Sequence, residues 1–253
     1  MSFRYAWNDL RTWVKLRLKG RTPGHGEIYA AKIAAKLRRG EAHATLGGRA
    51  WDGAQGDLGT EWSSESFAAR GVAVFEELQR LGLRRGMRCL DYGCGSLRIG
   101  QHVMRLLDPG CYIGLDVTDE FYTYGLANIG PELIAEKRPH LAVLSDAVID
   151  EQAKAPPDFL FSSAVVQHVP PRELGTYFGR ILKLTGADTT AVVSFVIADK
   201  VQRTAQFSWF YPAERLIRAV RDLDPAIRID VVPYDITDQD RRGRQRQALV
   251  LRR

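Results

Sequence analysis

The chain is poor in cysteine and has no long apolar run. Its three cysteines, Cys89, Cys94 and Cys111, are odd in number and lack the paired spacing of zinc ligands, so neither a disulfide framework nor a metal site is indicated. No uninterrupted apolar stretch approaches the ~18 residues that cross a bilayer. Charged residues begin at Arg4, which leaves no signal-peptide core. These absences predict a cytoplasmic protein that contacts membranes at most peripherally.

Glycine, proline and charge are not in excess either. The 253 residues are 45% hydrophobic and 26% charged, with 23 Gly and 11 Pro, as in ordinary globular proteins, which excludes a fibrous or purely disordered chain. The length is enough for one α/β domain with a buried core and an appendage.

The positive charge is concentrated at the N-terminus. Residues 1–40 carry a net charge of +8 while the whole chain carries +6, so the remaining residues sum to −2. Apolar side chains recur every three or four residues over 3–19, which predicts an amphipathic helix, and the Ala-rich stretch 27–39 predicts a second helix. Residues 45–62, with five glycines and two tryptophans, predict a loop. We therefore expect an N-terminal extension over 1–62 and the main domain over 63–253.

Beyond residue 86, short apolar runs alternate with amphipathic helical segments. This alternation favours βαβ units and a mostly parallel sheet. Between the last two runs there is no room for a crossover helix, so these should pair antiparallel. The expected strands are 87–91, 112–116, 141–144, 159–163, 191–197, 227–232 and 247–251.

A glycine turn follows the first of these strands. The strand ends in an acid, Asp91, and Gly93 and Gly95 then open a helix. Glycines let the backbone approach a ligand closely, and the N–H groups of the turn can bind a carboxylate or phosphate.

Two further acids end the next two strands. Asp116 lies 21 residues after Gly95, where a carboxylate can accept hydrogen bonds from both ribose hydroxyls, and Asp146 follows the third strand. Ligands of parallel sheets bind at the carboxyl ends of the strands. We therefore expect the three acids to meet at one nucleoside site. The alternative is that the glycines only form a tight structural turn that binds no ligand.

Together, CLDYGCGS, YIGLD, LSDA and PDFLFSSAVVQHV resemble the class I S-adenosylmethionine-dependent methyltransferases over roughly residues 65–253. The resemblance implies a Rossmann-like three-layer α/β sandwich with a seven-stranded, mostly parallel sheet in the order 3-2-1-4-5-7-6. It implies S-adenosylmethionine as cofactor and S-adenosylhomocysteine as product. In its terms Asp91, Gly93 and Gly95 hold the methionine end, Asp116 the ribose and Asp146 the adenine. The other residues implied to line the cofactor are Cys94, Ser96, Val117, Ala147, Ser162 and Ser163.

Two residues of this sequence bear on alternative cofactors, NAD and a metal ion. A dinucleotide dehydrogenase needs a third glycine where this chain has Arg98, which disfavours NAD. Many resembling enzymes carry an acid where this chain has Ala164, so no metal dependence is inferred.

Several side chains have both a catalytic and a structural interpretation. His168, after the fourth strand, could take the proton from the acceptor, or it could pack and form hydrogen bonds. Trp51, Trp62 and Tyr211 could close over the acceptor or anchor loops to the core.

The sequence indicates the methyl acceptor less directly than the cofactor. Enzymes with this type of glycine turn resemble those that modify small molecules and sugars, so we expect a hydroxyl or amine of a small molecule or glycan. An RNA methyltransferase guided by the basic arm, and a silent cofactor-binding scaffold, are the alternatives. Residues 1–40 could pack on the domain, on a second subunit in a homodimer or on an anionic membrane; nucleic acid is the less favoured partner because no RNA-binding module accompanies the charge.

Overall fold

The computed structural model describes residues 14, 24–38, 64–205, 207–234 and 245–253. Its α-helices are α2 (His25–Arg38), α3 (Ser64–Arg80), α4 (Gly100–Leu106), α5 (Asp119–Ile129), α6 (Pro131–Lys137), α7 (Asp146–Ala153), α8 (Leu174–Lys183) and α9 (Ala213–Arg221). Two short 3-10 helices, η3 (Val166–His168) and η4 (Pro171–Glu173), lie between the fourth strand and α8.

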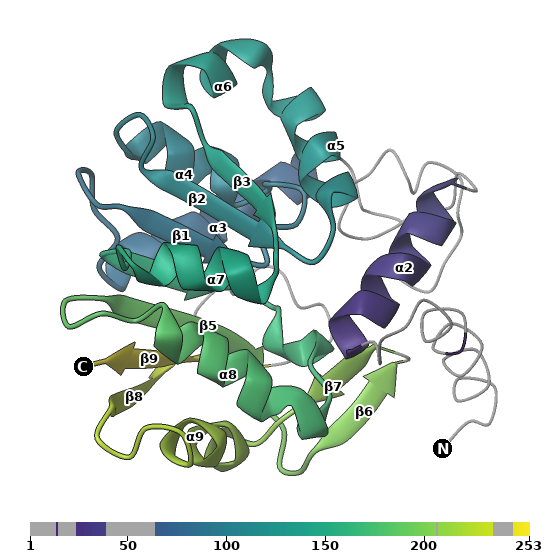
Figure 1. Ribbon diagram of the computed structural model, residues 1–253, viewed down its shortest axis with the longest axis vertical. Helices are drawn as coiled ribbons and strands as arrows, with labels where there is room; N and C mark the ends of the chain where they lie inside the picture. Colours follow the sequence, from purple (N-terminus) through teal and green to yellow (C-terminus); the bar gives the residue numbers. More distant parts are fainter. Residues whose placement is uncertain (1–13, 15–23, 39–63, 206, 235–244) are drawn as a thin grey trace.

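A seven-stranded sheet with the order β3-β2-β1-β4-β5-β9-β8 forms the centre of the molecule (Figure 1). Its strands are β1 (Cys89–Tyr92), β2 (Tyr112–Asp116), β3 (His140–Val143), β4 (Phe159–Ser162), β5 (Thr190–Val196), β8 (Arg228–Pro233) and β9 (Arg246–Arg252). The pairs among β1 to β5 are parallel, whereas β9 runs antiparallel to both β5 and β8. The predicted three-layer α/β fold is thus confirmed, including the antiparallel pairing of the last two strands.

Side chains of the central strands are buried on both faces of the sheet. Leu160 of β4 packs with α7, α8 and α9 on one face, whereas Phe159 and Phe161 pack with α3 and α4 on the other. Successive residues of a strand point to opposite faces, so the continuous apolar runs of the sequence follow directly from a sheet covered on both sides.

The sequence analysis missed one element, a hairpin of β6 (Gln202–Ala205) and β7 (Ser208–Phe210) between β5 and α9. All four residues of β6 are exposed, so this strand has no apolar alternation that a sequence pattern could reveal. The hairpin explains why the last two strands of the sheet are numbered eight and nine here. The order of the sheet itself is the expected one.

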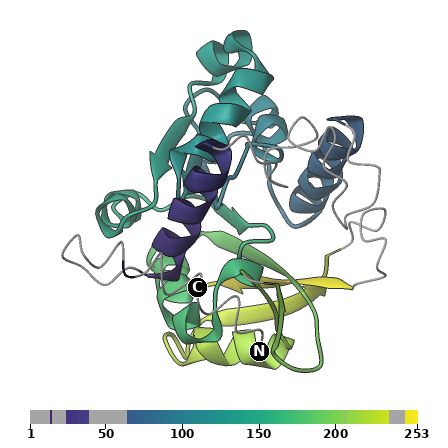
Figure 2. The ribbon, with the colours of Figure 1, turned by 90° about the vertical axis from the view of Figure 1, so that its right-hand side faces the viewer.

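Helix α2 lies across the carboxyl ends of the parallel strands, beside the β6–β7 hairpin (Figures 1 and 2).

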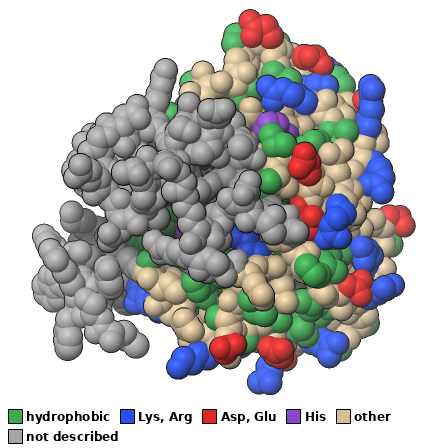
Figure 3. All heavy atoms as spheres, turned by 180° about the vertical axis from the view of Figure 1, so that it is seen from behind, with side chains coloured by type: hydrophobic (Ala, Val, Ile, Leu, Met, Phe, Trp, Pro, Cys, Tyr) green, Lys and Arg blue, Asp and Glu red, His purple; other side chains and the backbone are tan. Residues whose placement is uncertain are grey.

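On the face opposite to that seen in Figure 1, acidic and basic side chains are interspersed (Figure 3). Among the described residues, no helix is both long and apolar enough to span a membrane. The helix expected over 3–19 and the loop expected over 45–62 fall outside the described residues, apart from residue 14.

Candidate functional site

The glycine turn after β1 is tied to the end of β2. The amides of Gly93 and Cys94 both donate to the carbonyl oxygen of Leu115, at 2.7 and 3.0 Å. Gly93 has φ +89° and Gly95 has φ +54°, backbone conformations that favour glycine. A Cβ built on Gly93 would lie 2.3 Å from Cγ2 of Val165, so the loop after β4 packs directly on this turn.

Asp116 is the acid most closely joined to the turn. Its Oδ2 accepts from the Gly95 amide and its Oδ1 from the Val117 amide, both at 2.8 Å. Burial raises its pKa to about 6, against the lowering effect of backbone hydrogen bonds from Gly95, Val117 and Thr118. A carboxylate oxygen can accept more than one hydrogen bond, so a carboxylate fixed in this way can still receive a pair of ligand hydroxyls.

Asp91 lies deeper, within strand β1. Its side chain is 2% exposed, and its Oδ2 accepts a 2.8 Å hydrogen bond from the Tyr112 hydroxyl. Burial raises its pKa to about 8, although the Tyr112 bond opposes that rise. Asp91 is therefore mostly protonated at neutral pH, and its side chain joins β1 to Tyr112 of β2.

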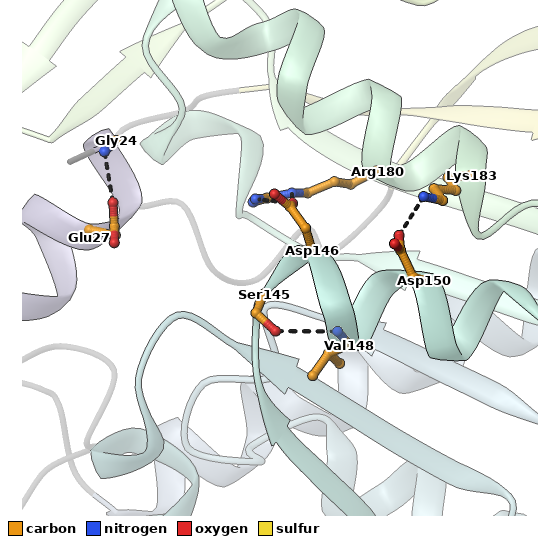
Figure 4. A network of polar contacts seen from close by, with 8 residues as sticks. All are labelled: Gly24, Glu27, Ser145, Asp146, Val148, Asp150, Arg180 and Lys183. Atoms are coloured by element: carbon orange, nitrogen blue, oxygen red, sulfur yellow. Dashed lines mark hydrogen bonds and ion pairs between the residues drawn. The ribbon is translucent and has the colours of Figure 1, made fainter. Parts of the chain in front are cut away.

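Asp146, the third acid, is exposed at the start of α7. Its side chain is 83% exposed, and its Oδ1 accepts both guanidinium bonds of Arg180 from α8, at 3.2 and 2.7 Å (Figure 4). A second ion pair, between Asp150 and Lys183, joins the same two helices (Figure 4). Ser145 caps α7, its hydroxyl accepting from the Val148 amide at 3.2 Å. The acid thus stands at the carboxyl edge of the sheet with a cation beside it.

The end of β4 separates the two serines of the sequence motif. Ser162 is fully buried; its hydroxyl donates to the Tyr92 carbonyl at 2.9 Å and accepts from the Tyr177 hydroxyl at 2.8 Å. Ser163 is partly buried and accepts from the Ser194 hydroxyl at 3.4 Å. Ser162 therefore joins β4 to β1, and only Ser163 of the pair has a side chain that reaches the surface.

His168, in η3, is partly buried and has a defined proton arrangement. Its Nδ1 lies 2.6 Å from the carbonyl oxygen of Phe207. A carbonyl only accepts, so Nδ1 carries a proton, and in the neutral ring Nε2 is an acceptor. Burial lowers the pKa of His168, with the Phe207 bond opposing it. The neutral imidazole that results can take up a proton at Nε2.

Two non-glycine residues on these loops adopt left-handed backbone conformations. Leu97, after the glycine turn, has φ +57°, and Ala164, after β4, has φ +58°. The Ala164 amide donates to the Ser194 hydroxyl at 3.0 Å, which holds it in place. Strained residues of this kind gather at functional sites, and both of these lie on loops at the carboxyl edge of the sheet.

Comparison with solved structures identifies the architecture. Magnesium protoporphyrin IX methyltransferase from Synechocystis PCC 6803, solved with S-adenosylmethionine, aligns with a TM-score of 0.58 at 14% identity, over 91% of this chain and 98% of that one. The DhpI complex with S-adenosylhomocysteine aligns with a TM-score of 0.55 at 12% identity, over 91% and 98%. A glycopeptide N-methyltransferase bound to sinefungin aligns with a TM-score of 0.54 at 8% identity, over 73% of this chain and 93% of that one.

The chain has the class I methyltransferase fold. No protein-family model and no curated protein matches the sequence. At these identities the likeness is one of architecture, and the chemistry has to be argued from the residues.

Within the methyltransferase fold, the remaining predicted site residues have mixed placements. Cys94 is buried, and burial raises the pKa of its thiol, which suits a small filler of the turn. Tyr211 is 1% exposed and packs in the core, and its hydroxyl donates to the Val169 carbonyl at 2.5 Å. Trp51 and Trp62 lie outside the described residues. Ser96 is buried, Val117 is partly buried and Ala147 is exposed.

The sequence analysis missed two residues that the methyltransferase fold brings to this edge. Arg180 pairs with Asp146 from 34 positions away, and Tyr29 of α2 stacks on His168. Neither contact has a local sequence signal, because each joins elements that only the tertiary fold brings together. Among the described residues, no group of three or more His, Cys, Asp or Glu side chains could hold a metal ion.

Proposed function

We propose that the protein is an S-adenosylmethionine-dependent methyltransferase that methylates a hydroxyl or amine of a small molecule or glycan. The observation that carries this proposal is the position of Asp116, a buried carboxylate that the amides of Gly95 and Val117 hold at the carboxyl end of β2. In a parallel sheet this is where a ribose binds. The antiparallel β9 and the partly buried Arg98 in the third glycine position both disfavour a dinucleotide dehydrogenase.

The residues present fit the donor. Asp116 would accept from both ribose hydroxyls, while the adenine would lie against Asp146 and Ala147. The open backbone of Gly93 and Gly95 would receive the methionine end, with Asp91 beneath it and Ser163 on the adjoining loop. When bound, the sulfonium supplies a methyl group that is already activated, so the protein mainly has to align the partners and exclude water.

His168 would act as the general base. Its Nδ1–H is fixed on the Phe207 carbonyl, and its Nε2 lies 3.4 Å from the side-chain amide nitrogen of Gln167. In place of that long contact, Nε2 would accept the proton that the acceptor oxygen or nitrogen loses as the new bond forms. Because burial lowers its pKa, the ring is neutral and able to accept at physiological pH.

Helix α2 favours a small acceptor. It crosses the carboxyl edge of the sheet (Figure 2), and its Ile33 is buried against Phe121 of α5, so part of that edge is covered. Two structural neighbours are named as enzymes for a porphyrin and a glycopeptide, which suits this class of acceptor. Interspersed charges on the face in Figure 3 do not favour a nucleic acid there. Residues 1–40 would contact the domain, a second subunit or a membrane surface.

A calorimetric titration of the full chain with S-adenosylhomocysteine tests the proposal, with NAD as the matched competitor. We expect saturable binding of the first ligand with one site per chain, and none of the second. Asp116→Ala should abolish most of the heat while the variant stays folded. Absence of binding by the wild-type chain, or preference for NAD, would overturn the proposed function. Donor binding without turnover on any acceptor of a small-molecule and glycan panel would favour the scaffold alternative.

A further inference from the structure

Helix α2 lies outside the sheet core, yet its residues contact the loops of the candidate site. Ile33 is buried against Phe121 of α5. At the other end of the helix, a Cβ on Gly26 would lie 3.4 Å from Cγ1 of Val117, the residue that follows Asp116. One side of α2 therefore sits on the segment after β2, where the ribose would bind.

Tyr29, in the middle of α2, contacts the histidine and lies near the ribose acid. Its ring stacks on His168 with 5.6 Å between ring centroids and 27° between planes. Burial raises the pKa of Tyr29, and the negative charge of Asp116 raises it further, so the phenol is neutral and within electrostatic reach of that carboxylate. Tyr29 thus packs on the loop after β4, while Gly26 of the same helix lies against the residue after Asp116, so α2 spans both loops.

A third element completes the enclosure of His168. Phe207, in the β6–β7 turn, meets the Tyr29 ring edge-on at 5.4 Å, and its carbonyl accepts from His168. The ammonium of Lys32 lies 4.8 Å from the centroid of the Phe207 ring. The imidazole is therefore held by α2, by its own loop and by the hairpin. Among the described side chains of α2, Tyr29 and Lys32 bring titratable groups to this cluster.

We propose that Tyr29 is a positioning residue that fixes the His168 ring for proton transfer, and that α2, which carries it, is the cover that opens to admit the donor. This inference rests on the proposed function. A stacked ring restrains the imidazole plane, whereas the Phe207 carbonyl restrains its proton, and the two together leave Nε2 in one orientation. Such pre-orientation is what a general base requires, because proton transfer depends on geometry before it depends on pKa.

The arrangement predicts how His168 titrates in the protein without ligand. Tyr29 covers the ring, and burial is the cause of its lowered pKa. Removing the phenol ring in Tyr29→Ala admits water, so the pKa of His168 should rise by about half a unit or more towards its ordinary value. Tyr29→Phe keeps the stack and the burial and should leave that pKa in place.

The experiment is a proton NMR pH titration of the full chain and both variants, with His168→Gln to assign the signal. The inference is supported if the pKa of His168 rises in Tyr29→Ala and keeps its wild-type value in Tyr29→Phe. Equal titration of His168 in all three proteins would overturn it. Tyr29→Ser, which also removes the ring and admits water, replaces the alanine variant if that one does not fold.

Amide hydrogen exchange separates this inference from the proposed function. If α2 is the cover, amides of residues 25–38 should exchange more slowly when S-adenosylhomocysteine is bound, and Tyr29→Ala should lose this protection and bind the ligand several-fold more weakly. Unchanged exchange in a chain that binds the ligand would refute the cover while leaving the methyltransferase proposal intact. A chain that does not bind the ligand at all refutes the proposed function, and the NMR titration still decides the role of Tyr29.

Discussion

Replacing Asp91 with asparagine should make the protein more stable, and the gain should grow with pH. Asp91 is a carboxyl group buried in β1, whose pKa burial raises from 3.8 to about 8. Between these values the unfolded chain has lost a proton that the folded chain retains, so the free energy of unfolding falls as pH rises. Asp91→Asn removes this ionisation but keeps an oxygen that can accept from the Tyr112 hydroxyl.

The magnitude follows from the raised pKa. Each pH unit between the two pKa values costs about 1.4 kcal/mol, so over the roughly 3 units up to neutral pH the wild-type chain loses about 4 kcal/mol that Asp91→Asn does not lose. Near pH 4, where the buried carboxyl group is protonated and uncharged, the two proteins should have similar stabilities. The advantage of the variant should level off once the pH passes the folded-state pKa of about 8.

Urea unfolding at a series of pH values measures this directly. Asp188→Asn, at an exposed position before β5, is the matched control and should show no comparable trend. A difference between Asp91→Asn and wild type that stays constant with pH would refute the reasoning. It would mean that Asp91 has the same pKa in the folded and unfolded chain and is ionised in the folded protein at neutral pH.

Three further outcomes are expected. Gly93→Ala should lower the free energy of unfolding in urea by at least about 2 kcal/mol, because the new Cβ would meet Val165. The control is Gly110→Ala, where φ is also positive but the surrounding space is open, and it should cost only about 1 kcal/mol. Equal costs for the two variants would contradict the close packing of Gly93 on Val165. Asp116→Ala should weaken S-adenosylhomocysteine binding in calorimetry by at least about tenfold, and an unchanged affinity would remove Asp116 from the ribose site. Asp146→Ala should weaken S-adenosylhomocysteine binding about fivefold. Asp150→Ala breaks the neighbouring ion pair between α7 and α8 and should leave this affinity unchanged. Equal effects of the two variants would assign Asp146 a structural role only.

The sheet was predictable because its strands are buried on both faces. Runs such as Phe159–Ser162 are continuous and apolar, and their alternation with amphipathic helices leaves few topologies. Strand ends were placed within two residues of those observed. The β6–β7 hairpin escaped prediction because its first strand is exposed, so no burial pattern marks it.

The candidate site was predictable only where its residues directly follow or end consecutive strands. The glycine turn and Asp116 fall into this class, and the Gly95 amide does meet Asp116. Partners contributed by other elements were not predictable: Tyr112 for Asp91, Arg180 for Asp146, and Tyr29 for His168. These contacts depend on packing across helices and strands, which a periodic pattern does not encode.

A crystal structure of the full chain with S-adenosylhomocysteine tests the central claim most directly. The account predicts the ribose hydroxyls within hydrogen-bonding distance of Asp116, the homocysteine end on the turn of Gly93 and Gly95, and helix α2 closed over the ligand with Tyr29 on His168. A ligand bound elsewhere, or a carboxyl edge filled by side chains with no ligand against Asp116, would contradict it.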